Sequence, residues 1–169
     1  MAHFAVVFTR KHHLQTAISM RETPLFQELD RDQCIAVLDR NHIGRVAYTF
    51  RDRVDISAMS YVYDDGWLYI RTEVGDKLVT MAHNRWVAFE VDEIEGRFDW
   101  RSVVVRGAIY VLDPDERAKE HRHAVKLLRT LIPETFRPKD PTPFRDIVLR
   151  IHLDRVRGRA AMSAFESRI

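Results

Sequence analysis

Two strand segments joined by an Asp-Gly turn constrain the fold of this chain more than any other feature. Residues 54–63 have the alternation of a strand, and residues 67–72 return as a second strand after Asp64-Asp65-Gly66. An Asp-Gly pair supplies the positive φ angles that a two-residue hairpin turn requires. Strands joined by so short a turn are antiparallel, so the chain is predicted to form an antiparallel sheet.

Four further segments are typical of strands, and they indicate the fold class. They are residues 44–50, 86–91, 100–112 and 147–153. Six antiparallel strands with peripheral helices favour a mainly β fold, a six-stranded antiparallel barrel, because closing a sheet removes its exposed edges. Residues 92–99 are expected to form a polar loop. Gly107 predicts a bulge or a close backbone approach, as strands that bend around a barrel require.

Three helices are expected around this sheet. The first spans residues 30–40, where Asp30 and Gln33 resemble a capping box. A short helix is expected at residues 75–83. The third is expected over residues 113–131, because an Asp cap, a Pro at the first helical position and a Glu in the first turn are typical of a helix start.

Length and charge limit the organisation of the chain and its partners. A chain of 169 residues suits one domain. We expect that domain over residues 20–169, with residues 1–19 as a dispensable N-terminal extension. The 27 Lys and Arg nearly cancel the 25 Asp and Glu, and a net charge of +2 gives no reason to expect a nucleic-acid partner. The arginines near the C-terminus favour such a partner only weakly, since no aromatic residues interleave with them: Arg150, Arg155, Arg157 and Arg159.

The single cysteine and the hydropathy pattern indicate a compartment. Cys34 falls on the apolar stripe of the first helix, so it is expected in the core, and one cysteine cannot form an intrachain disulfide. The cytoplasm is therefore the expected compartment. No apolar run approaches the roughly 20 residues that span a bilayer, so no membrane partner is expected.

Motifs for common catalytic and metal chemistry do not occur. The six glycines are too scattered for a dinucleotide fingerprint or a P-loop, and neither H-E-x-x-H nor G-x-S-x-G is found. His121 and His123 are two residues apart on a predicted helix, so they point to different faces and cannot share a metal. The sequence identifies no metal site and no catalytic residue.

The end of the second hairpin strand is the first candidate site. Arg71 and Thr72 end this strand, and Lys77 lies in the first turn of the expected helix. A guanidinium, a hydroxyl, helix amides and an ammonium could converge on one phosphate dianion. The alternative is a solvated surface on which these cations pair with Glu73 and Asp76.

The fifth predicted strand is the second candidate. Alternation places Trp100, Ser102, Val104 and Arg106 on one face of this strand. An aromatic ring beside a hydroxyl could line a flat ligand, and plain core packing is the alternative.

The chain resembles the pyridoxamine-5'-phosphate-oxidase-like FMN-binding split barrels, and within them the branch that includes the nitroimidazole-resistance proteins. The resemblance extends over roughly residues 25–160. It is carried by the order and spacing of IGRVAY at 43–48, SYVYDDGWLY at 60–69, GDKL at 75–78, VAFEVDE at 87–93 and the strand at 100–107. A preceding helix and a final strand ending near residues 157–159 also match in kind.

This resemblance implies an FMN site in a homodimer. The isoalloxazine is expected along the second barrel strand, partly held by main-chain groups, with the phosphate at the end of the third strand and the following helix. Further contacts are expected from the fifth strand, often from the other subunit. The residues at these places are Ile56, Ser57, Ala58 and Met59 for the ring, Arg71, Thr72 and Lys77 for the phosphate, and Trp100, Arg101 and Ser102 for the further contacts.

The sequence also departs from the family. Many members carry Pro-Val where this chain has Ala58-Met59, which changes the packing at the ring edge but leaves backbone donors available. Oxidases of vitamin B6 carry basic residues on the second strand for the substrate phosphate, whereas residues 55–59 contain none. This difference argues against vitamin B6 oxidation.

The expected function is an FMN-dependent oxidoreductase of the nitroreductase or flavin-reductase type, with a small-molecule electron donor and acceptor. One alternative is the deazaflavin F420, whose acidic tail could follow Arg45, Arg71, Lys77 and Arg106. A second is haem, with His42 or His83 as axial ligand. A third is a non-catalytic flavin-binding module.

Overall fold

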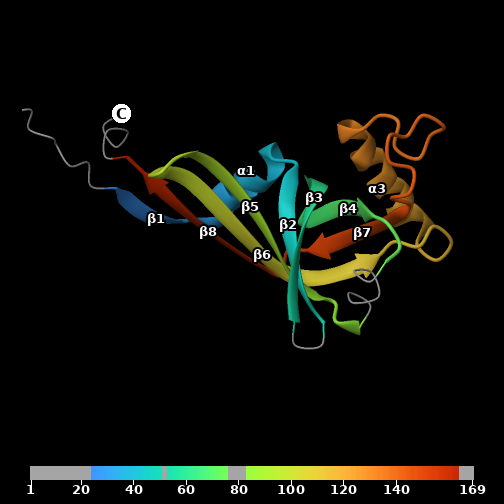
Figure 1. Ribbon diagram of the computed structural model, residues 1–169, viewed down its shortest axis with the longest axis horizontal. Helices are drawn as coiled ribbons and strands as arrows, with labels where there is room; N and C mark the ends of the chain where they lie inside the picture. The colour runs from blue at the N-terminus through green and yellow to red at the C-terminus, as the bar shows by residue number, and fades with distance from the viewer. Residues whose placement is uncertain (1–23, 51–52, 76–82, 164–169) are drawn as a thin grey trace, which may run out of the picture.

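The computed structural model describes residues 24–50, 53–75 and 83–163, and it contains one antiparallel sheet of eight strands (Figure 1). The sheet order is β1-β8-β6-β5-β2-β3-β4-β7, and β6 also pairs with β7. The elements follow one another along the chain as β1 (Leu25–Leu29), α1 (Arg31–Arg40), β2 (Ile43–Phe50), β3 (Arg53–Asp64), β4 (Trp67–Thr72), β5 (Trp86–Gly96), β6 (Asp99–Val111), α3 (Ala118–Leu131), β7 (Ile147–His152) and β8 (Arg155–Met162).

The pairing of β6 with β7 closes six strands into a ring. These six strands, β2 to β7, are the six predicted from the sequence, so the barrel class is confirmed. Strand β1 was not predicted, and β8 was indicated only by the family resemblance; the two bring the total to eight. Strand β8 pairs with the first half of β6, and β1 pairs with the other edge of β8, so both extend the sheet beyond the ring (Figure 1).

The main hydrophobic core fills the ring and continues under α1. Tyr61 and Phe89 are fully buried inside it, with their ring centroids 5.2 Å apart. Cys34 is buried on the inner face of α1, as predicted. The hydroxyl of Tyr61 donates to the carbonyl of Leu38 at 2.8 Å and so ties α1 to the barrel. The capping box of Asp30 and Gln33 is also confirmed.

A second core lies outside the ring, where α3 covers β4 and β7 (Figure 1). Its buried side chains come from β3, β4, β7 and α3, and they include Val62, Tyr69, Val148 and Leu128. This helix packs its apolar face on the sheet and leaves its basic face outward. Neither helix in the described part of the chain combines the length and hydropathy of a membrane span.

Two predicted boundaries were wrong. Residues 92–99 are not a loop, because β5 continues to Gly96 and pairs with the first residues of β6, which pair on their other edge with β8. Helix α3 begins at Ala118 rather than at Asp113. The carboxylate of Asp113 accepts from the amides of Asp115 and Glu116, so it caps hydrogen-bonded turns that precede the helix.

The helix expected at residues 75–83 and the extension at residues 1–19 fall wholly or mostly outside the described residues. The same holds for Lys77.

Gly107 meets the predicted close backbone approach. A Cβ at this position would overlap the carbonyl oxygen of His152, at the end of β7. At Gly96, by contrast, the nearest atom to an added Cβ is the Cβ of Asp99 at 3.8 Å, an ordinary contact.

We expect Gly107→Ala to lower the free energy of unfolding by about 2 kcal/mol or more, because backbone atoms have to move. Gly96→Ala, the matched control, should change it by less than about 0.5 kcal/mol. Urea unfolding followed by circular dichroism measures both. Equal stabilities of the two variants would contradict the close contact.

Candidate functional site

The hairpin of β3 and β4 opens at one end, and this opening is the candidate site. Strand β3 pairs with β2 from Arg53 to Ser60, but it pairs with β4 only from Tyr61 to Asp64. Over residues 54–60, the edge of β3 that faces away from β2 therefore has no strand partner among the described residues. An unpaired edge presents N–H and C=O groups that a ligand or another chain can bind.

The ladder between β2 and β3 determines which backbone groups reach the free edge. The amide of Tyr61 donates to the carbonyl of His42 at 2.9 Å, so the backbone of Tyr61 faces β2. Backbone direction alternates along an antiparallel strand. The N–H and C=O groups of Ile56, Ala58 and Ser60 therefore point away from β2, where a flat heterocycle with donors and acceptors at its rim could bind.

The side chains of the predicted ring-binding residues point to two different sides of β3. Ile56 and Ala58 are exposed on the outer face of the sheet, whereas Met59 is buried in the barrel core and Ser57 is half-buried. A ligand on the outer face can touch only the first two side chains. At the backbone edge, Ile56 and Ala58 present their N–H and C=O groups, whereas those of Ser57 and Met59 are directed to β2.

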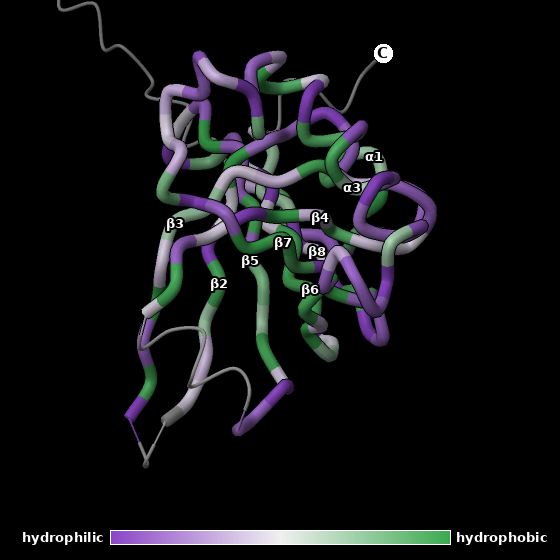
Figure 2. The backbone as a smooth tube through the Cα atoms, turned by 90° about the vertical axis from the view of Figure 1, so that its right-hand side faces the viewer, coloured by the Kyte–Doolittle hydropathy of each residue, from purple (hydrophilic) through white to green (hydrophobic). Residues whose placement is uncertain are grey.

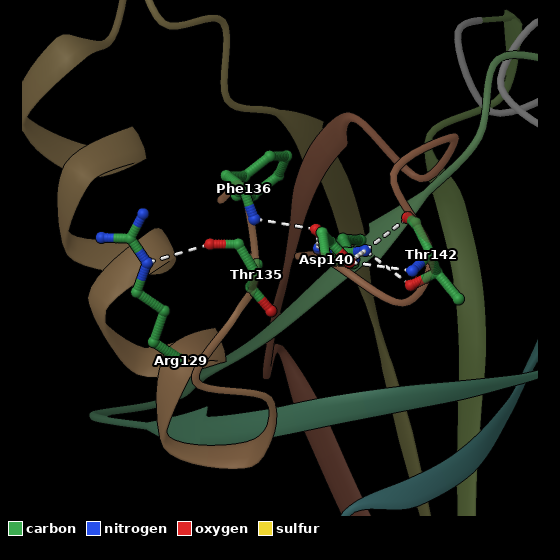
Figure 3. Close-up of polar contacts among 6 residues, drawn as sticks. Arg129, Thr135, Phe136, Asp140 and Thr142 are labelled. Carbon is green, nitrogen blue, oxygen red and sulfur yellow. Dashed lines mark hydrogen bonds and ion pairs between the residues drawn. The ribbon is translucent and has the colours of Figure 1, made fainter. Parts of the chain in front are cut away.

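The end of β4 lies next to this edge, and it holds a buried ion pair. Arg71 is 7% exposed and Asp140 is 3% exposed, and two parallel hydrogen bonds of 2.8 and 2.9 Å join the guanidinium to the carboxylate. The guanidinium also donates to the carbonyl and hydroxyl oxygens of Thr142, both at 2.6 Å. Figure 3 shows Asp140 between Phe136 and Thr142, whose backbone amides donate to it at 2.8 and 2.9 Å.

This environment stabilises the charged form of the carboxyl. The hydrogen bonds from Arg71 hold the pKa of Asp140 well below its usual range, and the amides of Thr142 and Phe136 act in the same direction. The contacts of Arg71 are thus directed to the loop before β7, and its part in phosphate binding stays a prediction. Thr72 is buried, with 4% exposed, at the register position opposite Ile147.

The third group of predicted residues lies on β6, apart from the other two. Trp100 is half-buried and contacts Phe26 with ring centroids 6.3 Å apart, and the hydroxyl of Ser102 donates to Glu90 at 2.9 Å. Arg101 points to the opposite face, 3.8 Å from Glu93. Strands β5 and β2 separate β6 from β3, which amounts to roughly 14 Å measured along the outer face of the sheet. One copy of the chain does not bring these groups together.

Two of the cations proposed for a deazaflavin tail are engaged by carboxylates of the chain itself. Arg45 donates to Glu90 and Asp92 on the outer face, and Arg71 is buried against Asp140. The proposed haem ligands His42 and His83 are both exposed. In the parts of the chain that the structure describes, no three His, Cys, Asp or Glu side chains form a group that could hold a metal ion.

The outer face of the sheet carries large exposed apolar side chains. Figure 2 shows β2, β3 and β5 running side by side, with both hydrophobic and hydrophilic residues along them. The apolar side chains on this outer face are 62–70% exposed and comprise Phe26, Ile43, Val54, Ile56, Trp86 and Ile94. Exposed apolar residues gathered on one face are typical of a surface that another molecule covers.

The predicted alternation ended at residue 153 and did not identify β8, which only the family resemblance indicated, although a signal was present. The segment Arg155-Val156-Arg157-Gly158-Arg159 alternates with the period of a strand and places three arginines on one side.

Comparisons with known proteins find relatives that are similar to this chain in sequence and in structure. Residues 30–160 match the family model described as pyridoxamine 5'-phosphate oxidase. A FAD-binding protein from Mesorhizobium loti is 28% identical and superposes with a TM-score of 0.68, over 82% of this chain and 99% of that chain. An uncharacterised protein from Rhizobium meliloti (strain 1021) is 26% identical over 142 residues, which are 79% of this chain and 93% of that protein.

A third relative is similar in fold alone. It is a candidate 5-nitroimidazole antibiotic resistance protein from Bacteroides thetaiotaomicron, 19% identical, with a TM-score of 0.62 over 91% of this chain and 96% of that chain.

We expect Asp140→Asn to lower the free energy of unfolding by about 3 kcal/mol at pH 7, because it leaves the buried guanidinium of Arg71 without a counter-charge. The folded-state pKa of Asp140 is depressed, so its contribution is present above about pH 4 and decreases as the pH falls further. The stability difference from wild type should therefore shrink in acid.

Denaturant unfolding between pH 3 and pH 7 tests this prediction. Asp39→Asn makes the same charge change at an exposed position and should cost less than about 0.5 kcal/mol. An Asp140→Asn variant as stable as wild type at pH 7 would mean that Arg71 is not clamped by this pair and is available to a ligand.

Proposed function

Because this chain belongs to the pyridoxamine 5'-phosphate oxidase family, we propose that it is an FMN-dependent oxidoreductase whose flavin lies between the two copies of a homodimer. The family resemblance predicted from the sequence is confirmed. The proposal goes further, to the cofactor, the reaction class and the partner. A relative described as FAD-binding supports a flavin in the wider sense.

The free edge of β3 is the observation that carries this proposal. The rim of an isoalloxazine alternates donors and acceptors, and the backbone groups of Ile56, Ala58 and Ser60 offer the complementary pattern without disturbing the ladder with β2. Proline is tolerated only where the backbone N–H is outside a ladder. The Pro that many relatives carry at position 58 is consistent with an N–H that β2 does not need.

The phosphate is proposed at the end of β4. The hydroxyl of Thr72 and the ammonium of Lys77 would meet it, with the backbone amides that follow Gly75. The ion pair of Arg71 with Asp140 positions this corner by anchoring the loop before β7 to β4. Each of these contacts is a charge-assisted hydrogen bond or a point charge suited to a dianion.

The bound flavin would supply the hydride and electron chemistry, and this chain would bind and orient it. No side-chain acid or base is assigned, in keeping with the absence of catalytic motifs. A nitroreductase or flavin-reductase activity with a small donor and acceptor fits such a site. The lack of basic side chains in the segment 55–59 argues against vitamin B6 phosphate as the substrate.

The cytoplasm is the compartment that we propose, because the one cysteine of the chain is buried and free.

The dimer is proposed from two features of the outer face. The exposed apolar side chains there need a cover. The predicted contacts on β6 lie roughly 14 Å from β3 along the outer face of one copy, and a two-fold partner could bring its own Trp100 and Ser102 to the ring. The cofactor site would then be incomplete without the second copy.

A non-catalytic flavin-binding module is the second candidate, because the free edge of β3 would hold a flavin equally well without turnover. Steady oxidation of a reduced nicotinamide with a quinone or nitro acceptor would favour the enzyme, and bound flavin without turnover would favour the module.

We expect Lys77→Ala to weaken FMN binding at least tenfold while leaving riboflavin binding unchanged, since riboflavin has no phosphate. Quenching of flavin fluorescence measures both affinities. Lys119→Ala removes an exposed lysine of α3 and serves as control. Unchanged FMN affinity, or an equal loss for riboflavin, would contradict the phosphate assignment.

We expect the double variant Ile43→Arg, Ile94→Arg to be monomeric and to lose FMN, because charge is introduced into the face that the partner would cover. Both side chains are exposed, so the fold itself should tolerate the change. Light scattering after size-exclusion chromatography gives the mass, and Phe144→Arg, an exposed apolar position away from this face, is the control. A monomeric wild-type protein that retains FMN would contradict the shared site.

A further inference from the structure

Helix α3 and the loop that follows it form an open pocket, which we call the α3 pocket. Its volume is about 740 Å³, within the range of small-molecule sites. Figure 1 shows this helix and its loop at the opposite end of the molecule from β1. None of the residues placed so far at the free edge of β3 or on the outer face of the sheet lines the pocket.

The cations of the α3 pocket have no acidic counterpart. Four line it, and no Asp or Glu does: Arg122, Lys126, Arg129 and Arg137. Residues 118–131 as a whole contain four Lys or Arg and one Glu. Within the described part of the chain, none of the four lining cations has a carboxylate at ion-pair distance.

Helical spacing gathers three of these cations into one row. Arg122, Lys126 and Arg129 recur at i, i+4 and i+7, so they share a face of α3 and extend over roughly 10 Å along its axis. Like charges four residues apart destabilise a helix. The row is therefore stabilised by an anion that comes from outside the chain.

Arginines elsewhere in the protein are matched by carboxylates. Arg45 has both Glu90 and Asp92 as partners. Arg71 is joined to Asp140 at 2.8 Å. The unmatched charge is thus a property of the α3 pocket and not of arginines in this chain generally.

An aromatic residue in a strained conformation forms the wall opposite the helix. Phe136 has a φ of 55°, a region that bulky residues rarely adopt. Its amide donates to Asp140 at 2.8 Å, and its ring centroid lies 5.1 Å from the guanidinium of Arg71 and 6.2 Å from the ring of His121. A residue held in such a conformation by its surroundings points to a use for its side chain.

The loop is tied to the helix before any ligand binds. Figure 3 shows Arg129 reaching from α3 to the loop, where its Nε donates to the carbonyl of Thr135 at 3.0 Å. The amide of Thr135 donates to the carbonyl of Ile132, and that of Arg137 to the carbonyl of Glu134, both at 3.0 Å. A site fixed in advance loses less conformational entropy when it binds a ligand.

We propose that the α3 pocket binds a phosphate ester with an aromatic body. The ring packs against Phe136 and Val125, which line the pocket beside the cations. The phosphate lies among Arg122, Lys126 and Arg137, because guanidinium forks and an ammonium suit a dianion. This site is separate from the phosphate position proposed at the end of β4, and it does not depend on the proposed flavin function.

The pocket favours a small ester over a membrane surface or a nucleic acid. A helix that lies on a membrane presents an apolar face to the lipid, whereas the buried apolar residues of α3, Ala124 and Leu128, pack on the sheet. Single-stranded nucleic acids are bound by successive aromatic platforms, whereas Phe136 is the one Phe, Tyr or Trp that lines this pocket.

Isothermal titration of the purified full-length chain with phenyl phosphate tests the proposal. We expect phenyl phosphate to bind at least fivefold tighter than inorganic phosphate, because its ring contacts Phe136, and phenol not to bind at millimolar concentration. One equivalent of FMN per chain should leave the affinity for phenyl phosphate unchanged. We expect Arg122→Gln, Lys126→Gln to weaken phenyl phosphate binding at least tenfold.

Two further variants separate charge from ring. Arg31→Gln, Arg97→Gln makes the same change in net charge at exposed positions on α1 and on the turn between β5 and β6, and it should change the affinity less than twofold. Phe136→Leu should remove the preference for phenyl phosphate over inorganic phosphate.

Stability distinguishes loss of the site from loss of the fold. We expect the variant Arg122→Gln, Lys126→Gln to melt at the same or a higher temperature than wild type without ligand, because repulsion within the helix is relieved. Its melting temperature should no longer rise when phenyl phosphate is added, whereas that of wild type should.

Several outcomes would overturn the proposal. They are no binding of phenyl phosphate at millimolar concentration, equal affinities for phenyl phosphate and inorganic phosphate, and equal losses in the pocket variant and its charge control. Abolition of phenyl phosphate binding by the first equivalent of FMN would assign the probe to the flavin corner instead. Tighter binding of vesicles of anionic lipid, or of a single-stranded oligonucleotide, than of phenyl phosphate would make this face a macromolecular surface.

Failure of the proposed function gives a different result. A wild-type protein that binds phenyl phosphate as expected but does not bind FMN would contradict the flavin site and leave the α3 pocket supported.

Discussion

The contact between Gly107 and the backbone of His152 is the constraint on which the rest of the structure depends. Strand β6 pairs with β8 up to Arg106 and with β7 from Ile109, so it changes partner at Gly107. Strand β7 ends at His152 and β8 begins at Arg155, so the chain must cross from one partner of β6 to the other there. A side chain at position 107 would block the crossing, and with it both the closure of the ring and the seating of β8.

The free edge of β3 and the groove between β6 (residues 100–106) and β8 (residues 155–159) both follow from departures from perfect pairing. Strand β3 exposes backbone groups because its pairing with β4 ends at Tyr61 and Ile70, while β4 continues to Thr72 paired with β7 alone. The groove exists because β8 joins β6 outside the ring. In both places the fold retains the core on one face and leaves the other face incompletely covered. Function in a barrel this small depends on such openings, since its interior is filled by side chains.

The sequence predicted what local chemistry determines. Alternation and the Asp-Gly turn were enough for the six ring strands, and Gly107 was correctly singled out. The pairing of β5 with β6 through residues 92–96 was not predicted, because this part of β5 has the polar composition of a loop. The ion pair of Arg71 with Asp140 joins residues 69 positions apart, and no local pattern identifies such a partner.

Charge shows most clearly why whole-chain quantities are poor guides to a site. A net charge of +2 argues against a polyanion partner only if acidic and basic residues are mixed everywhere. On this sheet they are segregated by strand: the carboxylates of β5 neutralise Arg45 on β2, while the arginines of β8 face β6, which offers them none. On the same face of the sheet, the side chains of β2 and β5 thus balance in charge while those of β6 and β8 are positive, although the whole chain is nearly neutral. Register places each charge, so register rather than composition decides where an anion can bind.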